Sequence, residues 1–82
     1  MTKYQQVLRA NIAAALGRRG FTQQDAARRL DLSRQAFSSR MRGDMEFRLG
    51  ELVALACFLG VSMTVLIDGL DRCDDVSSVE AA

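Results

Sequence analysis

TQQDAARRLDLSRQAFSSRMRG, residues 22–43, contains two complete helix-start signals. Thr22 is suited to be an N-cap, and Asp25 can return a hydrogen bond to the cap from three positions further on. Ser33 repeats the N-cap signal for a second helix. Gly43 supplies its end, because glycine readily adopts the left-handed conformation that follows a helix. The segment therefore predicts two short helices, over about 23–30 and 34–42, joined by a tight turn.

The second predicted helix has two unlike faces. Phe37 and Met41 lie on one face. The other face carries only polar side chains, those of Arg34, Gln35, Ser38, Ser39 and Arg42. Arg and Gln can both make bidentate hydrogen bonds to base edges, so this short helix suits insertion into the DNA major groove.

The pattern T-Q-x-x-A-A-x-x-L-x-L-S-x-x-x-F-S-x-x-x-x-G in this segment resembles the helix-turn-helix of the Cro and phage-repressor family, the lambda-repressor-like, xenobiotic-response-element class of bacterial regulators. The later segment ELVALACFLGVSMTVLIDG, residues 51–69, resembles the ending of that family. The likeness covers roughly residues 5–69. It implies an all-α, compact five-helix domain with the helix-turn-helix at helices 2 and 3.

The resemblance also implies roles at the matching positions. Ser33, Arg34, Gln35, Ser38 and Ser39 occupy positions that face bases. The expected phosphate contacts are Thr22, Gln23, Arg18, Arg19, Arg40, Arg42 and Arg48. Two alternatives stay open: Ser33 caps its helix whether or not it touches DNA, and Arg18 and Arg19 could serve only as charges that complement the end of the first helix.

Three positions depart from the family pattern. Arg40 stands where an apolar residue is usual, and Met41 where a Glu is usual, so we expect either a slightly rotated helix or an Arg40 with a packed stem and its head toward phosphate. Arg48 stands where Thr or Ser commonly caps the fourth helix, which weakens that helix start. Asp31 replaces a common glycine, but Asp tolerates the turn that is needed.

Length and charge agree with a small nucleic-acid binder. The 82 residues suffice for one domain, and the absence of Pro with an Ala-, Leu- and Arg-rich composition favours an all-helical fold. The formal net charge of +1 is the sum of two unlike segments. The basic domain, residues 1–69, has ten Lys and Arg against six Asp and Glu, whereas the acidic tail, residues 70–82, has one Arg against four acids. We expect the tail to be disordered.

Several function classes are disfavoured. The chain has no His, and its two cysteines, Cys57 and Cys73, show no metal-ligand spacing, so we expect no enzyme activity, metal or cofactor. We expect no small-molecule ligand, because 82 residues are too few for an additional ligand-binding domain. Cys57 is expected to be a core thiol and Cys73 an exposed one. No apolar run is long enough to span a bilayer and no signal peptide is recognisable, so we expect a cytoplasmic protein with no membrane partner.

The remaining elements follow from helical periodicity. Apolar residues at Tyr4, Leu8, Ile12, Ala15 and Leu16 predict a first helix that ends at Gly17 or Gly20. A fourth helix is predicted from Leu49, with Leu52, Leu55, Ala56 and Leu59 facing inward and Gly60 as its stop. Ser62 should cap a last helix over 63–68, closed by Gly69, with Leu66 in the core.

The end of the domain carries more apolar surface than one short helix can bury. We therefore expect a dimer interface at Phe58, Val61, Met63, Ile67 and Leu70. A homodimer would place two recognition helices on the half-sites of a pseudo-palindromic operator. The sequence thus predicts a transcriptional regulator, a repressor of phage or prophage type. The alternative is an antitoxin-like or other protein-interaction module that docks through the apolar surface 58–70.

Overall fold

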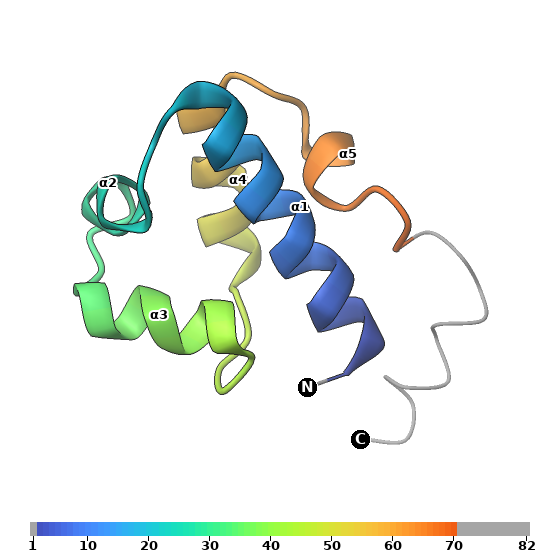
Figure 1. Ribbon diagram of the computed structural model, residues 1–82, viewed down its shortest axis with the longest axis horizontal. Helices are drawn as coiled ribbons and strands as arrows, with labels where there is room; N and C mark the ends of the chain where they lie inside the picture. The colour runs from blue at the N-terminus through green and yellow to red at the C-terminus, as the bar shows by residue number, and fades with distance from the viewer. Residues whose placement is uncertain (1, 71–82) are drawn as a thin grey trace.

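The computed structural model describes residues 2–70, and over this range the chain is all-helical (Figure 1). Its five helices are α1 (Lys3–Arg19), α2 (Gln23–Arg29), α3 (Arg34–Arg42), α4 (Leu49–Leu59) and α5 (Met63–Leu66). The all-α, five-helix expectation is confirmed. The predicted acidic tail lies outside the described residues, apart from Leu70.

The caps predicted for α2 and α3 define the starts of these helices, whereas Ser62 precedes α5 without a side-chain cap bond. Thr22 Oγ1 accepts from the backbone N–H of Asp25 at 3.1 Å, and Asp25 Oδ2 accepts from the N–H of Thr22 at 2.9 Å. Ser33 Oγ accepts from the N–H of Ala36 at 3.0 Å. Of the two glycines that could end α1, Gly20 does so, with a left-handed φ of 72°, whereas Gly17 lies inside the helix. Each of these signals is local, which is why the sequence alone predicts the helix boundaries well.

The turn between α2 and α3 uses the left-handed conformation predicted at Asp31, whose φ is 58°. The N–H of Leu32 then bonds the carbonyl of Ala27 at 2.9 Å and closes the end of α2. Ala26 and Ala27 are both buried, and these small side chains let α2 and α3 pack closely. The turn thus fixes the orientation of α3 relative to the rest of the domain.

A single core joins the helices. In Figure 1, α2 and α3 lie on one side of the long α1, α5 lies on the other, and α4 passes behind. The largest fully buried side chains are Phe37, Ile12, Leu55, Leu59 and Leu66. The loop between α3 and α4 is anchored to this core, because the ring of Phe47 packs edge-on against Phe37 with 5.7 Å between centroids. The inward stripe predicted for α4 is confirmed, and that of α1 is confirmed except at Tyr4, which is only half-buried.

Two expectations about the second half of the chain are wrong. The last helix ends at Leu66 and not at Asp68. The amide of Asn11 on α1 donates to the carbonyls of Leu66 at 2.8 Å and Asp68 at 2.9 Å, so a tertiary contact replaces further helical hydrogen bonds. Cys57 is exposed and not a core thiol, because it falls outside the inward stripe of α4.

Candidate nucleic-acid interface

The N-terminal half of α3 presents its polar side chains to solvent. Ser33, Arg34 and Gln35 are all exposed. Ser33 is occupied as the N-cap, whereas the side chains of Arg34 and Gln35 make no hydrogen bond or ion pair with any other residue in the range 2–70. These two side chains are free to bind groups on another molecule.

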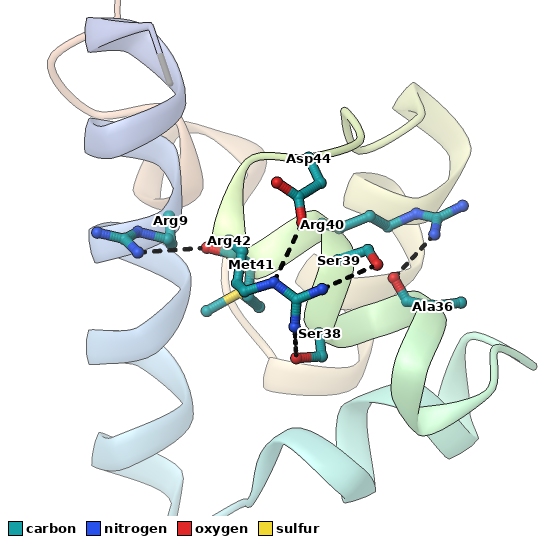
Figure 2. Close-up of polar contacts among 8 residues, drawn as sticks. All are labelled: Arg9, Ala36, Ser38, Ser39, Arg40, Met41, Arg42 and Asp44. Carbon is teal, nitrogen blue, oxygen red and sulfur yellow. Dashed lines mark hydrogen bonds and ion pairs between the residues drawn. The ribbon is translucent and has the colours of Figure 1, made fainter.

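The C-terminal half of α3 is organised by the guanidinium of Arg42 (Figure 2). Its Nε lies 3.1 Å from Asp44 Oδ2, its Nη1 donates to Ser38 Oγ at 3.0 Å, and its Nη2 donates to Ser39 Oγ at 3.4 Å. The Arg42–Asp44 pair is solvent-exposed. Because each serine oxygen accepts from Arg42, each hydroxyl keeps its own proton to donate elsewhere.

Arg40, one of the expected phosphate contacts, is buried and paired within the domain. Its side chain is only 7% exposed, and its Nε lies 2.9 Å from Glu51 Oε1 on α4, while its Nη1 donates to the carbonyl of Ala36 at 3.0 Å. Its head therefore points into the α3–α4 contact and not toward solvent. Figure 2 shows its bond to the Ala36 carbonyl. The expectation was wrong because a buried guanidinium needs a carboxylate, and Glu51 supplies it.

Glu51 has a second task at the start of α4. The same Oε1 atom accepts from the backbone N–H of Arg48 at 2.9 Å, so Glu51 caps the helix that Arg48 cannot cap with its own side chain. Burial alone would raise the pKa of Glu51. The Arg48 N–H and the Arg40 guanidinium outweigh that effect and hold the pKa below its usual value. The side chain of Arg48 remains exposed and lines an open hollow between the end of α2 and the first half of α4.

On the opposite flank of α3, an open hollow of ≈340 Å³ lies between α3, α1 and the first turn of α2. Its polar lining residues are Arg9, Gln23, Ser38 and Arg42. The Thr22 cap fixes the first turn of α2, and the exposed Gln23 on this turn lines the hollow together with residues of α3. Thus two expected contacts, Gln23 and Arg42, meet in one place.

Comparison with known families agrees with this geometry. A helix-turn-helix family model matches residues 12–66, which is more than half of the chain and includes both α2 and α3. The chain belongs to the Cro and repressor type helix-turn-helix family. A search of curated proteins and a search of solved structures returned no match.

Membership in this family makes the chain a DNA-binding helix-turn-helix regulator. The second helix of the motif is α3, the position that is called the recognition helix in this class. No helix within residues 2–70 has both the length and the apolar character needed to cross a membrane.

Two expected phosphate contacts lie away from the recognition helix of this helix-turn-helix protein. Arg19 sits over the ring of Phe21, 5.8 Å from its centroid, and reaches toward Gly60 at the end of α4. Arg18 lines a hollow with Thr64 and Asp68 beside α5. The structure therefore does not bring Arg18 and Arg19 together with Arg34 and Gln35.

The five residues expected at a dimer interface, Phe58, Val61, Met63, Ile67 and Leu70, are all half-buried against the core. Phe58 stacks on Phe21, with 4.4 Å between the ring centroids. The large apolar side chains that are most exposed in residues 2–70 were not predicted from the sequence: they are Met45, Leu49 and Val53, with 54%, 72% and 45% exposure. The i, i+4 spacing of Leu49 and Val53, outside the inward stripe of α4, was the available signal.

Proposed function

We propose that the protein is a homodimeric, sequence-specific transcriptional regulator that represses by occupying a pseudo-palindromic operator, as small regulators of phage or prophage type do. The observation that carries this proposal is the pair Arg34 and Gln35, exposed on the first turn of α3 and without a partner among residues 2–70. An Arg fork suits the O6 and N7 acceptors of guanine, and a Gln amide suits the N6 and N7 groups of adenine.

The rest of the α3 surface supports base reading in the major groove. Ser38 and Ser39 lie one turn further along the helix and can donate hydroxyl protons to base acceptors. Gln23 and Arg42 are exposed and line the hollow beside α3, and Thr22 and Arg48 are exposed as well, which suits contact with the phosphates on either side of a groove.

A dimer is needed because a single short helix reads only a few base pairs. Two recognition helices about 34 Å apart would meet two half-sites on one face of the duplex. We propose that Phe58, Val61, Met63, Ile67 and Leu70 contribute the dimer contact, since each is partly exposed beyond the core that it packs against. Native mass spectrometry of the complex with a selected duplex should then find two chains per DNA; one chain per duplex would contradict this part of the proposal.

The base-reading surface is tested by selecting bound duplexes from a random pool and measuring affinity by gel shift. Arg34→Ala with Gln35→Ala should lose sequence preference and retain weak, salt-sensitive binding, because each good bidentate pair contributes about 1–3 kcal/mol of discrimination. An unchanged preference would refute the assignment of α3 as the reading helix.

A matched control removes the same chemical groups elsewhere. Arg28→Ala with Gln6→Ala deletes one guanidinium from an exposed position on α2 and one amide from an exposed position on α1, and leaves α3 unchanged. This variant should keep the selected motif. If the wild-type protein binds no DNA and instead copurifies with a larger protein, the interaction-module alternative replaces the regulator.

A further inference from the structure

Arg9 on α1 is an exposed cation that forms a hydrogen bond with the recognition helix, but no acidic group of that helix neutralises its charge. Its Nη1 donates to the backbone carbonyl of Met41 at 3.4 Å (Figure 2). That carbonyl belongs to the last turn of α3, where helix carbonyls have no partner within the helix. No carboxylate among residues 2–70 pairs with Arg9, so its positive charge is uncompensated by the described part of the chain.

The surroundings of Arg9 are suited to an anion. The open hollow beside it is lined by the amide-bearing side chain of Gln23, the hydroxyl of Ser38 and the guanidinium of Arg42, together with Ala10, Ala13 and Met41. Every polar side chain in this lining can donate a hydrogen bond, and none is a carboxylate. Asp44, the partner of Arg42, is not among the lining residues.

The position of the hollow decides which anion it would take. It lies between α3 and α1, and Ser38 and Arg42 belong both to its lining and to the outward face of α3. When a helix lies in the major groove, the phosphates of one strand pass along each of its flanks. The hollow would therefore face one of the two strands.

We propose that Arg9 and Gln23 form a phosphate site at this hollow, so that α1 supplies a direct contact to the DNA backbone. This inference rests on the proposed function and adds to it a residue, Arg9, that sequence patterns did not select. Its guanidinium keeps four of its five N–H donors beyond the bond to Met41, which is enough for a bidentate contact to one phosphate.

The test compares Arg9→Ala with Arg28→Ala on the selected operator duplex and on a duplex of unrelated sequence. Both variants lose one positive charge from an exposed position. For Arg9→Ala we expect affinity to fall about tenfold on both duplexes, since a charge-assisted hydrogen bond is lost. The slope of log K against log salt concentration should become shallower by about 1, because one fewer phosphate is neutralised.

Two further measurements separate a phosphate contact from a structural effect. Arg9→Ala should still select the same DNA motif as the wild type, since it removes no base contact. Arg9→Lys should restore the salt slope, because it keeps the charge without the fork.

The possible failures are distinguishable. If the wild type selects a motif but Arg9→Ala and Arg28→Ala have the same affinity and salt slope, the Arg9 site is refuted while the proposed function stands. If Arg9→Ala binds more weakly with an unchanged slope and a lower melting temperature, Arg9 acts only on the fold and the inference is also refuted. If the wild type selects no motif, the proposed function itself fails.

Discussion

One arginine lies on each flank of the recognition helix, and the two differ in burial and in the group that they bond. On the α4 flank, Arg40 is buried and its charge is matched by Glu51 at 2.9 Å. On the α1 flank, Arg9 is exposed and is held only by a backbone carbonyl at 3.4 Å. The first arrangement fixes α3 to the domain, and the second leaves a cation available beside an open hollow.

This difference shows that a basic residue near a recognition helix has to be assigned by its partner and not by its position in the sequence. A guanidinium that a carboxylate neutralises inside the protein cannot also neutralise a phosphate. A guanidinium that only a carbonyl holds still carries its charge outward. The comparison predicts that substitutions on the α4 flank alter stability, whereas those on the α1 flank alter DNA affinity.

The largest expected effect is that of Glu51→Ala. It leaves the buried Arg40 without a carboxylate and removes the hydrogen bond to the N–H of Arg48, so the free energy of unfolding should fall by about 3 kcal/mol. Urea denaturation followed by circular dichroism measures this. Arg40→Met with Glu51→Gln is the control, because it removes both charges together and should lose much less. Equal losses in the two variants would contradict a role for the ion pair.

Acid titration should reveal the same pair. Burial raises the pKa of Glu51 in the folded state, but the hydrogen bonds with Arg48 and Arg40 outweigh this and lower it. The ionised Glu51 therefore stabilises the fold fully above the unfolded pKa near 4.5, and this stabilisation is lost as pH falls through the folded pKa. Glu51→Gln should therefore flatten the decline in melting temperature below about pH 4.5. Asp25, whose pKa is lowered by the backbone and hydroxyl of Thr22, provides the comparison. If Asp25→Asn alone flattens the decline, the Arg40–Glu51 pair is not the acid-sensitive element.

A smaller effect is expected at the exposed Arg42–Asp44 pair. Asp44→Asn removes a carboxylate from the recognition surface and should strengthen binding to every duplex about two- to threefold, while stability changes by less than about 1 kcal/mol. Gel shifts at two salt concentrations measure the gain, which should shrink at higher salt. Weaker binding would mean that Asp44 supports the bound conformation of Arg42.

The smallest effect on stability should come from Arg9→Ala. The bond to Met41 is long and comes from an exposed side chain, so the free energy of unfolding should change by no more than about 0.5 kcal/mol. Denaturation under the conditions used for Glu51→Ala provides the direct contrast. A loss comparable to that of Glu51→Ala would remove the distinction between the two flanks.

Local signals made most of the fold predictable. Thr22, Ser33 and Gly43 each act within a few residues of their own position, so the two helices of the motif could be placed from sequence. The burial of Arg40 could not be predicted in this way, because its partner Glu51 lies eleven residues away on another helix. Arg9 was missed for the same reason: its neighbour Met41 is 32 residues away, and no short motif connects them.

The three hydrogen bonds of Arg42 have a consequence for the energetics of binding. A free arginine side chain loses rotamer freedom when it is immobilised at an interface, at a cost of about 0.5–1.5 kcal/mol. Arg42 is already restrained by Ser38, Ser39 and Asp44 before any DNA is present. The C-terminal half of the recognition helix is thus preorganised, and within α3 most of the side-chain conformational entropy lost on operator binding should come from Arg34 and Gln35.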